Sequence, residues 1–433
     1  MNNTKRIHIS SSITGESEKK IVTKYVSNTI TDAFWADGNS NRMTLPPYDK
    51  NSVKILFAIS KAGFNSRMNI KVYAKKLDKK ALVYETNFTT IESARQLVNI
   101  ELTGSLFKKG ESMLLDNELI LNLFFELTIK GDKFSNENDI KSHLRFHYVR
   151  FIPQILKNKE WLTAKMFQDK WFSGSPSSSE PWRNAPKIDF IEFDWVRKFD
   201  RMKNAIDNLK EKIFTNNSKA RLLKMLSLMV ESGDLFLPAL DQTVKFGVDS
   251  NKIINHEVEH PKLQRMVNEK MPHFEKYYFQ SIPYSISKNI FSLETLDDCF
   301  GALAACQFRA VAMGTVTRKK DVKLFGNAII VVLDIHINEV KIYIKDSFDF
   351  IGNDEKLGVW DAEANEISIK FGSGYTILNK YYNDWKKDYN SGQDYHLYST
   401  LETHRESKTY KNAGITIFKR DDDKLFNNLN HLK

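Results

Sequence analysis

The chain has 433 residues, 41% of them hydrophobic and 12% aromatic, and a formal net charge of +10. Its length predicts about two or three domains, because a single core stops growing near 250–300 residues. No run approaches the roughly 18 consecutive apolar residues of a membrane span. The polar N-terminus has no apolar segment of the kind found in secretory signals, so we expect synthesis in the cytoplasm without a signal peptide.

The positive charge is spread along the chain. A basic balance favours nucleic acid, anionic lipid or acidic partners, but the lysines do not gather into a block of five to eight. We therefore expect a solvated basic surface and no dedicated nucleic-acid interface.

The N-terminal third of the chain is predicted to consist of β-strands that follow a flexible arm. Residues 1–25 are expected to form a flexible arm. Short β-rich runs such as 53–60, 68–77 and 118–129 are separated by turn residues, which is typical of antiparallel sandwiches. We predict an immunoglobulin-like β-sandwich over 26–147.

The middle of the chain, 148–234, is predicted to be helical. It contains a Ser- and Pro-rich linker at 173–186 and an amphipathic segment at 194–214, in which Ala205, Leu209 and Ile213 share one stripe. Such a stripe is ordinary core packing.

The remaining residues, 235–433, are predicted to form an α+β effector domain. The runs 326–337 and 340–346 flank Asn338-Glu339 and read as a β-hairpin. Cys299 and Cys306 are expected to be buried thiols. The predicted fold class is thus multidomain α+β: an N-terminal immunoglobulin-like sandwich, a helical middle and a C-terminal mixed α/β domain with an antiparallel hairpin.

The strongest candidate site is an acidic turn at the end of the second hairpin strand. Asp346 and Asp349 stand three residues apart, and two such carboxylates can bind a divalent cation such as Mg²⁺ or divide into an acid and a base. The structural alternative is that both aspartates only form turns that end the strand. His404-Arg405 is a candidate anion-binding pair, and the alternative for it is an ordinary surface position on a polar segment.

Two histidine patterns are weaker candidates for a metal site than the acidic turn. His256-Glu257-Val258-Glu259-His260 matches the zinc motif H-E-x-x-H, which requires a helix. Pro261 opposes that helix, so zinc is not the expected cofactor. His143 and His147 lie in an expected strand, where such positions are about 13 Å apart; we expect them to be structural or surface histidines.

Several segments together resemble a bacterial domain family of unknown function, often encoded near type VI secretion or polymorphic-toxin genes. These segments are HYVRFIP (147–153), Trp161 with KMFQDKWFSG (165–174), Asp194-Trp195, KIYIKDSFDFIGNDEKLGVWD (341–361) and SGQDYHLYS (391–399). The resemblance covers about residues 140–400 and implies a context of bacterial antagonism.

Asp346-Ser-Phe-Asp349 is also similar to the Asp-x-Tyr-Asp core of colicin M-type toxins. That resemblance implies metal-dependent phosphodiester hydrolysis of lipid II-like peptidoglycan precursors in a target-cell periplasm. Asp346 and Asp349 would be catalytic and metal-binding residues. Glu355-Lys356 stands where the His-Arg pair is expected, so His404 and Arg405 would supply the basic pair only if the fold brings them to the acidic turn. Phe348 replaces the tyrosine.

Three functional hypotheses result. The leading one is a secreted antibacterial effector, with an immunity protein as partner and a lipid-linked anionic substrate at the membrane surface. The alternative is a non-enzymatic adaptor or chaperone-like component of a type VI secretion locus. The third is a zinc hydrolase at His256–His260.

Overall fold

The computed structural model describes residues 29–114, 118–175, 187–260, 265–285, 296–325, 328–368 and 373–418. The expected arm at 1–25 and residues 176–186 of the expected linker lie outside the described residues. Two compact units are present: Met1–Ile155 with Lys356–Tyr389, called here the first unit, and Leu156–Glu355 with Asn390–Lys433, the second unit.

The first unit contains two antiparallel sheets from the N-terminal part of the chain. One has the order β1 (Ile30–Ala36), β2 (Ser52–Ile59), β5 (Arg95–Glu101). The other has the order β4 (Lys79–Thr89), β3 (Arg67–Lys76), β6 (Ile120–Ile129), β7 (Asp132–Ser135), with β8 (Leu144–His147) paired to β6. Alternate residues of β3, from Met68 to Ala74, are fully buried, as expected for a strand with one face in the core. Trp35 and Phe125 join the two sheets edge to face, with ring centroids 5.1 Å apart.

A segment distant in sequence completes the first unit. It comprises β16 (Lys356–Asp361), β17 (Glu366–Ser368), β18 (Tyr375–Leu378) and α9 (Asn379–Tyr389); α1 (Gly104–Lys109) belongs to the same unit. The Tyr148 hydroxyl donates to the Trp360 carbonyl at 2.6 Å and accepts from the Ala362 N–H at 2.8 Å. This buried tyrosine therefore fastens the late segment to the end of the N-terminal strands.

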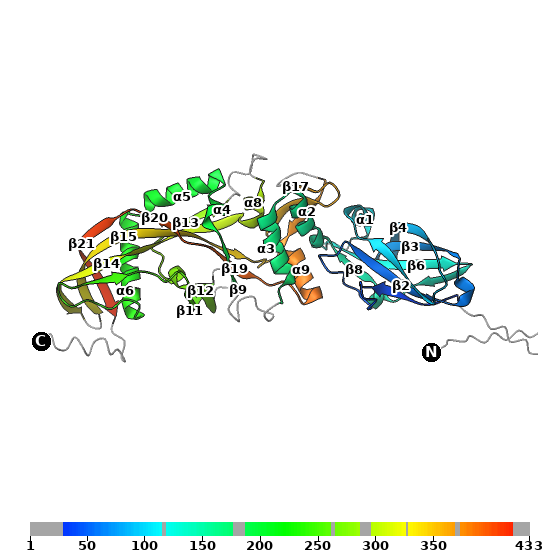
Figure 1. Cartoon of the computed structure of the whole chain (residues 1–433), viewed down its shortest axis with the longest axis horizontal. Helices are drawn as coiled ribbons and strands as arrows, with labels where there is room; N and C mark the ends of the chain where they lie inside the picture. The colour runs from blue at the N-terminus through cyan, green and yellow to red at the C-terminus, as the bar shows by residue number, and fades with distance from the viewer. Residues whose placement is uncertain are drawn as a thin grey trace, which may run out of the picture. The chain divides into compact units, whose positions relative to one another are not determined.

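The second unit is built on one long antiparallel sheet (Figure 1). Its centre is the pair β14 (Ala305–Phe325) and β15 (Ala328–Phe348), each 21 residues long. The strands along β14 are β10 (Thr243–Phe246) and β13 (Gln280–Ser285); those along β15 are β19 (Tyr395–Ser399), β20 (Glu402–His404) and β21 (Lys408–Phe418). β9 (Lys187–Ile191) adds a parallel edge to β19, and the sheet curls into a half-barrel. A separate hairpin is formed by β11 (Ile253–His260) and β12 (Arg265–Pro272).

Helices of the second unit pack on this sheet. α5 (Asp200–Lys212) contacts β13 and β14, and α6 (Asn216–Glu231) contacts β21 (Figure 1). The buried stripe of α6 includes Leu222, Met225 and Met229. The shorter helices of this unit are α3 (Leu162–Ser173), α4 (Phe193–Val196), α7 (His273–Lys276) and α8 (Asp298–Ala302), and α2 (Ile152–Asn158) contains residues of both units.

The predicted fold class is wrong. The fold is mostly β, with several sheets, and the helices between 148 and 234 form no distinct domain. The reason is that apolar helix stripes such as that of α6 are buried against sheet strands, so helices and sheet share one core.

The predicted hairpin around Asn338-Glu339 is also wrong. Residues 328–337 and 340–346 belong to one strand, β15, which pairs with β14; residues 326–327 of the first predicted run lie outside the described residues. Asn-Glu lacks the glycine that favours a two-residue hairpin turn, and the extra residue is accommodated as a bulge.

Two smaller predictions concern burial and membranes. Cys299 and Cys306 are buried and free, which confirms the prediction for both thiols. Within the described ranges, no helix has the length and apolarity needed to cross a bilayer.

Candidate functional site

The acidic turn lies at the C-terminal end of β15. Asp346 pairs with Leu397 of β19, and Asp349 follows the last residue of the strand. The Asp346 carboxylate accepts from the Ser347 N–H at 2.7 Å, and the Asp349 carboxylate accepts from the Ile351 N–H at 3.2 Å. Both half-buried side chains therefore bond to the backbone beside them, and Asp349 makes the turn-forming bond that the structural alternative expects.

The surroundings of Asp346 are largely aromatic. Phe348, on the same face of β15, stacks on Tyr395 with ring centroids 5.3 Å apart. Burial raises the pKa of the Cys306 thiol, and the charge of Asp346 raises it further. Burial likewise raises the pKa of Tyr395, with added effects of Asp189 and Asp346. The nearby thiol and phenol thus stay protonated at neutral pH.

The predicted basic pair lies elsewhere on the sheet. His404 pairs with Val340 of β15, six positions from Asp346, which corresponds to about 20 Å along a strand. Its imidazole contacts the Glu406 carboxylate at 2.9 Å. The structure therefore brings Asp346 and Asp349 to one turn and leaves His404 and Arg405 at a second location.

The H-E-x-x-H sequence occupies a strand. His256–His260 lies within β11, and His256 pairs with Glu269 of β12. Positions i and i+4 of a strand are about 13 Å apart, so the helical arrangement required by the zinc motif is absent. Among all the residues that the structure describes, no group of three or more His, Cys, Asp or Glu could hold a metal ion.

His143 and His147 both lie inside the first unit. His147 contacts the Asp388 carboxylate at 2.8 Å, and the same carboxylate accepts from Arg145 at 2.7 Å. Burial lowers the pKa of His147 more than the neighbouring Asp388 raises it. His143 contacts the Glu137 carbonyl at 3.1 Å. Each histidine therefore has a separate packing environment.

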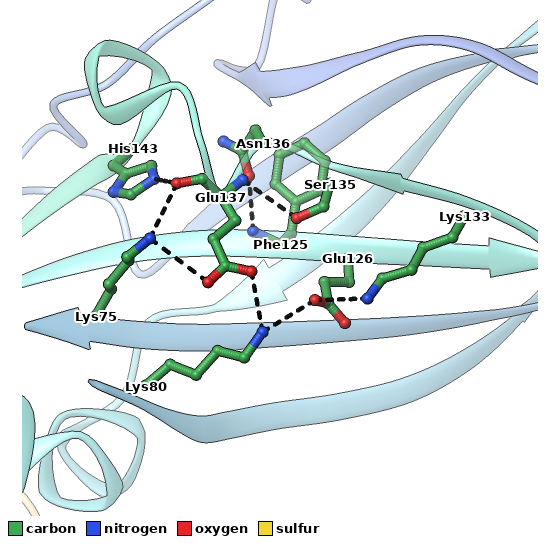
Figure 2. A network of polar contacts seen from close by, with 9 residues as sticks. All are labelled: Lys75, Lys80, Phe125, Glu126, Lys133, Ser135, Asn136, Glu137 and His143. Atoms are coloured by element: carbon green, nitrogen blue, oxygen red, sulfur yellow. Dashed lines mark hydrogen bonds and ion pairs between the residues drawn. The ribbon is translucent and has the colours of Figure 1, made fainter. Parts of the chain in front are cut away.

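A network of alternating charges lies on the second sheet of the first unit (Figure 2). Glu126 contacts Lys80 at 3.3 Å and Lys133 at 2.9 Å, and Glu137 contacts Lys80 at 3.0 Å and Lys75 at 3.5 Å. Burial raises the pKa of Glu126, but the bonds to the lysines lower it below its usual value. The ion pairs of Glu137 hold the loop after β7 against β3 and β4, and those of Glu126 join β6 to β4 and β7, so we assign the network a structural role.

A buried charge cluster in the second unit is centred on Glu275 of α7. The Glu275 carboxylate is bonded to Arg309, contacts Lys345 at 3.0 Å and accepts from the Tyr343 hydroxyl at 2.7 Å. Burial raises the pKa of Glu275, but the charges of Lys345 and Arg309 lower it more. The carboxylate, the two cations and the hydroxyl of the cluster bond to one another, which favours a role in stability.

Arg405 lines an open groove of about 800 Å³ on the long sheet of the second unit. The end of β10 and the residues after it form one side, and Arg405 and Ser407, between β20 and β21, form the other. The residues from the central strands that line the groove are Met313, Gly314, Asn338 and Glu339.

The groove lies where the sheet is interrupted. Met313 pairs with Glu339 and Gly314 pairs with Ile337, so Asn338 is an extra residue without a partner on β14. Pairing with β20 ends at Val340 and pairing with β21 resumes at Ile337, so the outer strands break at the same level. A Cβ on Gly314 would lie 2.0 Å from the His336 carbonyl oxygen. Only glycine fits this approach, and the bulge fixes the place of the groove.

In the groove, the acidic side chains have bonding partners among the described residues, whereas the basic side chains have none there. Glu339 pairs with Lys341 at 3.3 Å, and the Asp249 carboxylate accepts from the Asn251 N–H at 2.9 Å. Lys245 and Arg405 are exposed, and neither has an ion-pair partner within the described part of the chain. The groove therefore offers two cations to an external group.

The sequence pointed to one groove residue, Arg405, and missed the rest. Lys245, Met313 and Asn338 come from three distant segments, and no spacing pattern connects them. The signal that was available, Asn338-Glu339 inside a long β-rich run, fits a turn and a bulge equally well.

Comparison with known proteins assigns the chain to one protein family. The model of DUF6402, a family of unknown function, matches residues 148–373, just over half of the chain. No curated protein and no solved structure matches the chain. The match confirms the resemblance to a domain family of unknown function; the links to type VI secretion and to colicin M-type toxins stay predictions.

Proposed function

Because the chain belongs to the DUF6402 family, whose function is unknown, we propose its function from the candidate site itself. The protein is a non-enzymatic adaptor or chaperone-like component of a bacterial type VI secretion locus, and it binds a protein partner at the groove around Arg405. The secretion context rests on the sequence resemblance, and the binding role rests on the groove.

The observation that carries this proposal is the pair of cations without partners, Lys245 and Arg405, on opposite sides of a groove with a fixed floor. Surface cations that pair within their own protein have little left to offer a ligand. Here the acidic residues of the same groove have local bonds, whereas the two cations do not. Unpaired charge of this kind favours recognition of a complementary partner.

The effector hypothesis receives less support from the same geometry. Metal-dependent hydrolysis of a lipid-linked diphosphate would need carboxylates and a basic pair around one substrate. About 20 Å of strand separates Asp346 from the position opposite His404. A site made of Asp346, Asp349, His404 and Arg405 together is therefore not the one we propose.

The test is co-purification of the tagged chain with the products of neighbouring secretion-locus genes after co-expression. The wild type should recover a partner, and the Lys245→Glu/Arg405→Glu double variant should lose it. Asp346→Asn and Asp349→Asn should recover the partner at the wild-type level, because neither carboxylate lines the groove.

A growth assay separates the proposal from the effector hypothesis. The chain carrying an added periplasmic signal should leave a bacterial host unharmed. Lysis by the exported wild type, lost in Asp349→Asn, would overturn the adaptor proposal in favour of a hydrolase at the acidic turn.

A further inference from the structure

We infer that the groove binds an extended acidic segment of a protein partner, in which an apolar side chain stands between two carboxylates. This inference rests on the proposed function and names the chemistry of the partner. It is carried by the positions of the two cations on opposite sides of the central strands and by the apolar residues of the groove.

The two cations stand on opposite sides of the central strand pair. Lys245 on β10 pairs with Thr315 on β14, which pairs with His336 on β15, which pairs with Thr409 on β21. These three steps between neighbouring strands amount to about 14 Å. Arg405 lies between β20 and β21, on the far side of β15 from β10, so the two cations come from segments about that far apart along the sheet.

One apolar side chain, that of Met313, lies on the central strands between the cations, and two others, Phe246 and Val248, lie beside Lys245 on the β10 side of the groove. Phe246 is 5% exposed, and Met313 and Val248 are half-buried. Val248 also packs against the buried cluster of Phe274, Val311, Tyr343 and Tyr398. This backing fixes the β10 side of the groove, which gives an apolar side chain of a partner a preformed surface to contact.

An extended peptide fits this pattern. Residues i and i+4 of an extended chain are about 13 Å apart, and residues i, i+2 and i+4 point to the same side. A segment of the form Glu-x-Φ-x-Glu, where Φ is an apolar residue, would therefore direct two carboxylates to Lys245 and Arg405 and its apolar side chain to Met313. Asn338, which is exposed at the bulge, can bond to the peptide backbone.

The experiment uses the full chain and fluorescently labelled synthetic peptides of the form Glu-x-Φ-x-Glu, with Φ as Leu, Ile, Val or Phe. Fluorescence anisotropy should show saturable binding that weakens with added salt, because the contacts are charged. Replacing both glutamates by glutamine, or Φ by glycine, should weaken binding about tenfold or more.

Protein variants localise the effect. Arg405→Glu and Lys245→Glu should each weaken binding about tenfold. The double variant should instead bind the peptide in which lysines replace both glutamates, and this exchange cannot result from misfolding. Lys198→Glu, an equal charge change at an exposed position outside the groove, should leave binding unchanged.

Three outcomes would overturn the inference. An equal loss in Lys198→Glu would indicate general attraction to a basic surface. Complete displacement of the peptide by millimolar inorganic phosphate would indicate a small-anion site. Failure of all four peptides to bind, with partner co-purification still dependent on Arg405, would refute the acidic segment while leaving the proposed function intact.

Discussion

The buried Glu275 cluster gives the sharpest test of the energetics of the second unit. The side chain of Glu275 is 3% exposed and bonds to Arg309 and Lys345, whose side chains are 10% and 20% exposed. Glu275→Gln keeps the size of the side chain and removes its charge. Two cations then remain in a poorly hydrated site with no carboxylate between them.

The structure sets the size of the effect. Removing one partner of a buried ion pair costs about 3–5 kcal/mol. Lys345 is partly exposed, so its ammonium group can turn toward water, and Arg309 keeps its bonds to Gln307. We therefore expect the free energy of unfolding to fall by the lower end of this range, about 3 kcal/mol. With a urea m-value of about 3 kcal/mol/M, the unfolding midpoint should fall by about 1 M.

The assay is urea unfolding followed by far-ultraviolet circular dichroism. Hydrogen exchange of peptides from β14 and β15 should localise the loss to these strands. The matched control is Glu339→Gln, which breaks a partly exposed pair with Lys341 on the same strand and should cost less than about 1 kcal/mol. A loss in Glu275→Gln no larger than that of the control would refute the reasoning, because it would mean that water already solvates the cluster.

Three further predictions concern the bulge, a buried histidine and the two thiols. Gly314→Ala should destabilise the second unit by about 1–3 kcal/mol in thermal unfolding, because its Cβ would overlap a carbonyl oxygen. Gly414→Ala, whose Cβ would meet its nearest neighbour at 3.6 Å, should be nearly neutral, and equal effects of the two would contradict the assignment. Burial lowers the pKa of His147 below its ordinary value of 6.5, so the unfolded chain takes up a proton before the folded chain does. Its contribution is complete above pH 6.5 and is lost as the pH falls through the folded pKa; His147→Gln should therefore reduce the dependence of the urea midpoint on pH between 7 and 5, and an unchanged slope would count against it. Burial raises the pKa of Cys299 to about 12 and that of Cys306 well above its usual value. Both thiols should react with a disulfide reagent only after denaturation, and rapid reaction in the folded protein would show that they are accessible.

Local sequence patterns were sufficient where one face of one element decides the structure. The alternation in 68–77 predicts a strand, and Met68 and Val72 are fully buried on one face of it. The helical stripe of Leu209 and Ile213 is likewise buried. The acidic turn was correctly placed at the end of a strand, because Asp346 follows an apolar alternation that stops there.

Local sequence patterns could not predict where a segment lies in the fold. Residues 356–389 join the first unit through contacts such as Tyr148 with Trp360, which depend on a partner about two hundred residues away. Asn338 occupies a bulge because the opposite strand carries Gly314 at the level where the chain must pass closely. A turn and a bulge have similar local sequence, so only the opposite strand decides between them.

The sequence by itself determined the hydrophobic periodicity of strands and helices, the burial of the two thiols and the family membership. These properties depend on residues close together in the chain or on the order of the residues. The tertiary structure decided which strands pair, where the sheet is interrupted and which charges stay without partners. Lys245 and Arg405 face one groove because β14 and β15 bring their neighbouring strands to the same level. Such a site depends on long-range pairing, which no local pattern specifies.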